Sequence, residues 1–265
     1  MTTLDSWNVL RRFTDARIGL GRSGSGLPTR EVLAFALAHA EARDAVLTSI
    51  AWEPVEQDLR ELGFETLRAA SAVESRAEYL RRPDLGRKLS HSALQTSLEA
   101  ASLQSARPDL VIMVGDGLSS KAVEANIAPM LAALKPHIVQ SGWRLGPVVL
   151  AREARVALGD EIGEAFAAKA VLVLIGERPG LSSPDSLGAY LTWAPKVGLK
   201  DAERNCVSNI RVRGLSYGEA AFKISWLLSQ AFKRGLTGVQ LKDESEYQVI
   251  GSNVAATAIG AAAKT

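Results

Sequence analysis

KAVLVLIG, residues 169–176, is the clearest strand pattern in this chain. Six consecutive apolar residues stand between a lysine and a closing glycine. An apolar run of this length is typical of a strand that is buried on both faces, as in the middle of a parallel sheet. The stretch DLVIMVG, residues 109–115, has the same form, so the sequence predicts two buried strands.

Helical patterns and shorter strand patterns alternate around these two runs. Strands that alternate with helices imply right-handed crossover connections and therefore favour a parallel sheet with both faces covered. The further elements that we expect are helices over residues 119–139, 160–168 and 217–234, and strands over residues 147–151 and 187–193.

Before residue 105 the pattern is mostly helical. Thr29 is a suitable N-cap for a helix that runs to Ala40, and a second helix over about residues 89–103 has Leu94, Leu98 and Ala101 at helical spacing. We therefore expect an α/β fold in three parts. They are a mostly helical N-terminal region over residues 1–105, a Rossmann-like, mainly parallel sheet domain over residues 106–250, and a C-terminal tail over residues 251–265.

The composition narrows the class of protein. Hydrophobic residues make up 47% of the 265 residues, which is enough for a sizeable core. The formal net charge is only +2, so charge gives no reason to expect nucleic acid or membrane binding. The single cysteine, Cys206, favours a reducing compartment, and the start of the chain lacks the apolar core of a signal peptide. The sequence contains no run of about 18 apolar residues, so it predicts no membrane span.

Two loops follow predicted strands at the edge where open parallel sheets bind ligands. The loop GDGLSS, residues 115–120, could receive an anion at the start of the next helix, or it could be a plain turn capped by Ser119. The loop GERPGL, residues 176–181, could present Glu177 to a ligand, or it could be a proline-glycine turn with a surface pair of Glu177 and Arg178. The residues alone leave both choices open.

The remaining candidate residues give weaker signals. Cys206 lies in the segment NCVSNI and is expected to be a small buried hydrophobic residue. His39, His91 and His137 are far apart in the sequence and form no metal-binding motif.

Five segments carry a resemblance to a known family. Any one of them is only modestly specific, but all five occur in the family's order between about residues 14 and 210. Together they resemble the small subunit, or light chain, of ethanolamine ammonia-lyase. The segments are TDARIGLGR (residues 14–22), YLRRPDLGR (79–87), DGLS (116–119), GERPGL (176–181) and CVSNI (206–210).

The resemblance implies an adenosylcobalamin-dependent lyase that converts ethanolamine to acetaldehyde and ammonia by a radical mechanism. It implies a hetero-oligomer with equal numbers of small and large subunits, six of each, in which the large subunit binds ethanolamine. The enzyme would be cytoplasmic, and many relatives have an N-terminal extension that loads them into a bacterial microcompartment. Only about a dozen residues precede the first matching segment here, so encapsulation is left open.

The resemblance also implies which residues contact the cofactor. Val156 and Cys206 would make apolar contacts with cobalamin, and Glu177 would accept a hydrogen bond from it. No residue of this chain would be a catalytic acid, a catalytic base or a metal ligand. The motif D-x-H-x-x-G, whose histidine replaces the cofactor's own base on cobalt in some cobalamin proteins, does not occur in the sequence. We therefore expect the cofactor to bind in its base-on form.

Two other classes of function compete with this interpretation. A stand-alone nucleotide-dependent enzyme would use the loop over residues 115–120, and the isolated chain would bind NAD. A non-catalytic scaffold would form a complex with the large subunit whose cobalamin affinity does not depend on this chain. Both rank below the family resemblance.

Overall fold

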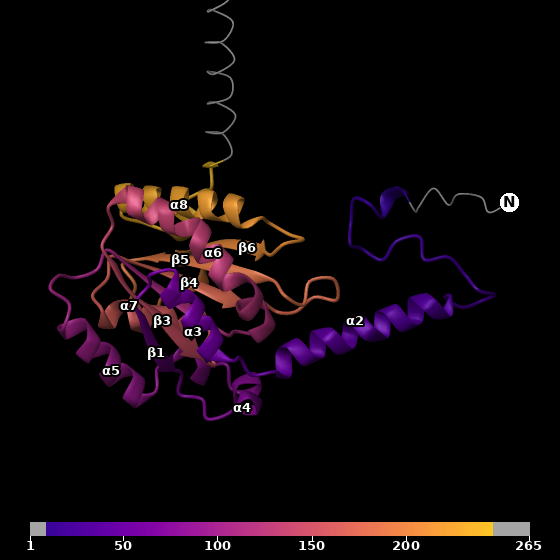
Figure 1. The fold of residues 1–265 in the computed structure, drawn as a ribbon, viewed down its shortest axis with the longest axis horizontal. Helices are drawn as coiled ribbons and strands as arrows, with labels where there is room; N and C mark the ends of the chain where they lie inside the picture. Colours follow the sequence, from indigo (N-terminus) through magenta and orange to yellow (C-terminus); the bar gives the residue numbers. More distant parts are fainter. Residues whose placement is uncertain (1–8, 246–265) are drawn as a thin grey trace, which may run out of the picture.

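A computed structural model describes residues 9–245 of the protein, and a single six-stranded sheet forms its centre (Figure 1). The strand order is β1-β3-β2-β4-β5-β6. The strands are β1 (Thr66–Ala70), β2 (Leu110–Gly115), β3 (Leu145–Arg152), β4 (Ala170–Gly176), β5 (Leu187–Trp193) and β6 (Arg204–Ile210). The helices are α2 (Thr29–Leu47), α3 (Trp52–Glu61), α4 (Arg76–Arg81), α5 (His91–Ser102), α6 (Ser120–Ser141), α7 (Leu158–Ala165) and α8 (Tyr217–Arg234), with short 3₁₀ turns η1 (Leu85–Arg87), η2 (Asp201–Glu203) and η3 (Gly238–Gln240).

Strand direction changes after the fourth of the six strands in the sheet. β1, β3, β2 and β4 are parallel to one another, whereas β5 and β6 are antiparallel additions next to β4. The connection between β4 and β5 contains no helix. A parallel neighbour needs a crossover of a dozen or more residues, so this short connection returns as an antiparallel strand. The fold is thus mixed α/β, with a parallel part of four strands and an antiparallel edge of two.

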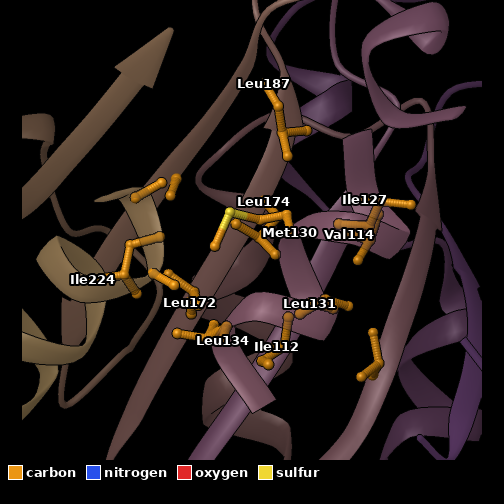
Figure 2. Packing of buried hydrophobic residues seen from close by; sticks show 14 of the residues in the cluster. Ile112, Val114, Ile127, Met130, Leu131, Leu134, Leu172, Leu174, Leu187 and Ile224 are labelled. Atoms are coloured by element: carbon orange, nitrogen blue, oxygen red, sulfur yellow. The ribbon is translucent and has the colours of Figure 1, made fainter. Parts of the chain in front are cut away.

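The two faces of the sheet are buried under different helices. Alternate residues of β2 point to opposite sides, so Ile112 and Val114 join one core cluster while Val111 and Met113 join the other. α3, α6 and α8 cover the first face, and α5 and α7 cover the second. Figure 2 shows the first core, where Met130 and Leu134 of α6 pack against the strands.

Local sequence explains the ends of the two longest covering helices. Ser119 accepts a hydrogen bond from the amide of Ala122 and so begins α6. Ser216 and Glu219 form a capping box at the start of α8, and Gly235 ends it in a left-handed conformation. The boundaries of α8 are those that the sequence predicts.

Several expectations need correction. Thr29 is the first residue of α2 rather than its N-cap, which is Pro28. In α5, Leu98 is exposed, and the buried positions are Ala93 and Ser97. The region before residue 105 is largely helical, but it also contributes β1 to the sheet, and β6 was not predicted. The C-terminal tail, residues 251–265, lies outside the described residues.

The first half of α2 projects away from the rest of the protein (Figure 1). Residues 32–37 have the sequence VLAFAL, and all six are exposed, including Leu33 at 64% and Leu37 at 62%. Of the helices in residues 9–245, none is long and apolar enough to span a bilayer. An exposed apolar helix of this kind is typical of a protein-binding surface.

A buried ion pair connects the antiparallel edge of the sheet to α7. Two nitrogens of Arg204 on β6 donate to the two carboxylate oxygens of Asp160 on α7, at 2.5 and 2.7 Å. Arg204 also donates to Thr192 on β5 at 3.0 Å. Burial raises the pKa of Asp160, while the bonds to Arg204 oppose that shift. The carboxylate therefore depends on Arg204 to remain ionised.

Replacing Arg204 with methionine should leave a buried carboxylate without its partner. We expect Arg204→Met to lower the free energy of unfolding by about 3–5 kcal/mol at pH 7, as measured by urea denaturation. The double variant Arg204→Met, Asp160→Asn should recover part of the lost free energy of unfolding, because it removes the unpaired carboxylate charge. A loss below about 1 kcal/mol would mean that the pair contributes little to stability.

Candidate functional site

The loops that follow β2 and β4 touch through their backbones. The amide of Leu118 donates to the carbonyl of Gly176 at 3.0 Å. A Cβ at Gly117 would lie 2.2 Å from that carbonyl oxygen, and a Cβ at Gly176 would lie 2.1 Å from the carbonyl oxygen of Ser119. Only glycine permits this approach, which joins the DGLS and GERPGL segments at the carboxyl ends of the two central strands.

Asp116 connects the first of these loops to the loop that follows β3. Its carboxylate is buried and accepts hydrogen bonds from the amides of Glu153 and Ala154, each at 3.0 Å. Glu153 has a positive φ of 52°, which is unusual for a side chain of this size. The two hydrogen bonds therefore hold a strained turn in place, and that turn carries Arg155 and Val156.

The charges around this turn form a compact network. Arg76 of α4 lies 2.9 Å from the carboxylate of Glu153 and 3.5 Å from that of Asp116. Burial, and next the Glu153 carboxylate, raise the pKa of Asp116 to about 6. At pH 7 Asp116 is therefore mainly ionised and able to accept both amide hydrogen bonds.

Tyr79 lies between two arginines beside the same turn. Its ring centroid is 4.2 Å from the guanidinium carbon of Arg155 and 4.8 Å from that of Arg76. The fully buried phenol donates to the carbonyl of Ala154 at 2.8 Å, and burial raises its pKa. These contacts are cation–π interactions that fix the direction of the Arg155 side chain.

A cavity of about 440 Å³ opens where these loops meet. Apolar and aromatic side chains form most of its lining, and two arginines and one glutamate supply its charges. This composition suits a ligand that is partly apolar and carries a few polar groups. The lining residues are Tyr79, Leu118, Arg155, Val156, Ile175, Gly176, Glu177, Arg178 and Tyr190.

Glu177 is half-buried at the edge of this cavity. Its Oε2 atom accepts hydrogen bonds from the hydroxyl of Ser186 and, at 3.2 Å, from the amide of Asn209. Within residues 9–245, no donor reaches its Oε1 atom. Of the two alternatives for this loop, the surface pair of Glu177 and Arg178 does not form, because the carboxylate accepts hydrogen bonds from Ser186 and Asn209 instead.

Cys206 lies next to the cavity rather than in the core. It pairs with Tyr190 across β5 and β6, and Tyr190 lines the cavity. The expectation that Cys206 is buried was wrong, because β6 is an edge strand and the residue is exposed. Partial desolvation by its neighbours, and then the Glu177 carboxylate, raise the pKa of its thiol, so the thiol is neutral at pH 7.

The three residues that the resemblance singles out therefore gather in one place. Val156 and Glu177 both line the cavity. Cys206 lies beside it, because it pairs with the lining residue Tyr190 on the neighbouring strand. Tyr79, Arg155 and Tyr190 were not singled out, although Tyr79 begins the YLRRPDLGR segment. The turn interpretation of residues 115–120 is confirmed, since Ser119 caps α6 and also donates to the carbonyl of Pro184.

Comparison with known proteins gives a consistent result. The family model for the ethanolamine ammonia-lyase light chain (EutC) matches residues 4–242. The ethanolamine ammonia-lyase small subunit of Xanthomonas campestris pv. campestris is 50% identical over 254 residues, which cover 96% of this chain and 93% of the relative. The chain belongs to the ethanolamine ammonia-lyase light chain family.

Two further small subunits of ethanolamine ammonia-lyase show the same similarity. The one from Pseudomonas aeruginosa is 51% identical over 244 residues, which cover 92% of this chain and 89% of the relative. The one from Pseudomonas fluorescens is 52% identical over 246 residues, which cover 93% and 90% respectively. The similarity thus extends well beyond the few residues of the cavity.

In this member of the light chain family, the five short segments that carry the resemblance also meet in space. Four of them supply Tyr79, Asp116, Glu177 and Cys206. The fifth approaches the same edge, because Arg17 donates to the carbonyl of Leu181 at 3.2 Å. Across residues 9–245, no three side chains of histidine, cysteine, aspartate or glutamate are grouped so as to hold a metal ion.

The close approach of the two loops at Gly117 predicts a large effect of adding one methyl group. We expect Gly117→Ala to lower the free energy of unfolding by at least about 2 kcal/mol more than Gly142→Ala, measured by urea denaturation. Gly142 is a matched control, because it has a similar φ of 68° but an added Cβ there would have no neighbouring atom within 4 Å. Equal losses for both variants would mean that the loops separate without cost.

Proposed function

We propose that this chain is the small subunit of an adenosylcobalamin-dependent ethanolamine ammonia-lyase and that the cavity beside Glu177 contacts the cofactor. The enzyme would convert ethanolamine to acetaldehyde and ammonia by a radical mechanism. The observation that carries the proposal is the clustering of Val156, Glu177 and Cys206 in a chain that belongs to the light chain family. The parallel part of the sheet is, on this proposal, a Rossmann-like cobalamin-binding unit.

The lining of the cavity fits cobalamin chemically. Cobalamin is a large, mostly apolar macrocycle with amide side chains and a phosphate-containing nucleotide tail. The amide donors match the free Oε1 atom of Glu177, and the apolar edges match Val156, Leu118 and Ile175. The neutral thiol of Cys206 offers a further uncharged contact.

The chemistry is divided between the cofactor and the protein on this proposal. Adenosylcobalamin, when bound, would supply the radical chemistry of the reaction. The residues of this chain bind and orient the cofactor, and none of them transfers a proton. We propose base-on binding, because none of His39, His91 and His137 lines the cavity.

A large-subunit partner that binds ethanolamine completes the proposal. The exposed VLAFAL segment of α2 is an apolar surface that such a partner could bury. Six small and six large subunits would form the complex, in the cytoplasm or in a bacterial microcompartment. A stand-alone nucleotide enzyme has less support, because the backbone of Gly176 packs against the loop over residues 115–120 where a nucleotide would have to bind.

Activity of the reconstituted complex tests the proposal. We expect acetaldehyde from ethanolamine and adenosylcobalamin when this chain is co-expressed with its large subunit, and none from either subunit alone. If a folded complex binds cobalamin but leaves ethanolamine unchanged, the proposed substrate is wrong and the proposed cofactor stands. Failure of the two chains to form a complex would reject the whole proposal.

Glu177 gives a more local test. We expect Glu177→Gln to weaken cobalamin binding to the complex by about tenfold, because an amide accepts a hydrogen bond less strongly than a carboxylate. Affinity can be measured by equilibrium dialysis with absorbance detection. Glu99→Gln, at an exposed position on α5, is the matched control and should leave affinity unchanged. Unchanged affinity in Glu177→Gln would remove this residue from the site.

A further inference from the structure

Arg155 is a cation without a counter-ion among the residues that the structure describes. It is half-buried and lines the cavity, yet within residues 9–245 no carboxylate lies within 4 Å of its nitrogens. Arg76 and Arg204, by contrast, each contact a buried carboxylate. Because desolvating an unpaired charge is unfavourable, Arg155 would gain from an anion that enters the cavity.

The side chain of Arg155 is also held in a fixed position. Its guanidinium stacks on Tyr79 at 4.2 Å and donates through Nη2 to the carbonyl of Tyr79 at 3.3 Å. Its backbone amide donates to the carbonyl of Gly86 at 2.8 Å. An anion that binds here would meet a donor group whose conformational freedom is already lost, which favours affinity.

The charges of the cavity indicate the kind of ligand group that belongs beside Arg155. Arg155 and Arg178 outnumber the one carboxylate, Glu177, whose Oε2 atom is already occupied. The cavity can therefore bind an anion at the arginines and accept a hydrogen bond at Glu177 Oε1. A phosphate ester linked to an amide-bearing apolar body satisfies both sides.

We propose that Arg155 binds the phosphodiester of the cobalamin nucleotide tail and makes the site select cofactors that contain this tail. The inference rests on the proposed function, since it assumes that cobalamin enters this cavity. It assigns to Arg155 a role in ligand discrimination that a residue serving only to hold the turn would lack.

The test compares two ligands that differ in the tail. Cobalamin contains the phosphodiester, whereas cobinamide has the same corrin ring but lacks the phosphodiester, the ribose and the base. Binding of cyanocobalamin and of dicyanocobinamide to the cofactor-free co-expressed complex would be measured by equilibrium dialysis. We expect Arg155→Met to weaken cobalamin binding by about 10–100-fold and cobinamide binding by less than about threefold.

Two further variants separate charge from structure. Arg155→Lys retains the charge and should recover part of the lost cobalamin affinity. Arg152→Met, on the same strand-and-loop segment but exposed and outside this cavity, should change neither affinity. If Arg155→Met weakens the binding of both ligands equally, or of neither, the proposed role of Arg155 is wrong. Cobalamin binding by the wild-type complex would still support the proposed cofactor in that case. If the wild-type complex binds neither ligand, the proposed cofactor site and this inference both fail.

Discussion

The backbone contact between Gly117 and Gly176 is the constraint on which the site depends. β2 lies between β3 and β4 in the sheet, so the loop that follows β2 can reach both neighbouring loops. It contacts one through the carbonyl of Gly176 and the other through the carboxylate of Asp116. A single four-residue segment, DGLS, therefore sets the relative positions of Val156 and Glu177, although neither is near it in the sequence.

The elements that the sequence predicts well are those with an unambiguous hydrophobic pattern. β2 and β4 are continuous apolar runs, and α8 has helical periodicity together with a capping box. β1 and β6 lack such patterns: β1 is the short sequence TLRAA, and β6, RNCVSNI, contains two asparagines, a residue type that is uncommon in strands. Both are edge strands, and their pairing partners rather than their own propensities determine their conformation.

The site was predictable only where a residue stands at the end of a recognisable strand. Glu177 follows β4 directly, so its place at the ligand-binding edge could be expected from the sequence. Tyr79 comes from α4, far from any predicted strand end, and only the tertiary fold brings its ring against Arg155. The exposure of Cys206 could not be predicted either, because burial of a small residue depends on whether its strand is central or at an edge.

The polar groups of the cavity are arranged unevenly, and this asymmetry bears on how the chain functions. The groups that hold the loops, Asp116 and Glu177 Oε2, have their protein hydrogen-bond donors, so the frame is complete in the absence of a ligand. Within residues 9–245, Glu177 Oε1 accepts no hydrogen bond, and Arg155 has the ring and carbonyl of Tyr79 as partners but no carboxylate. A preformed frame with a free carboxylate oxygen and an arginine that lacks a counter-ion requires little rearrangement on binding. It favours a ligand that carries both a hydrogen-bond donor and an anion. The exposed apolar segment of α2 is likewise a surface that this chain leaves uncovered, and it is available to a protein partner.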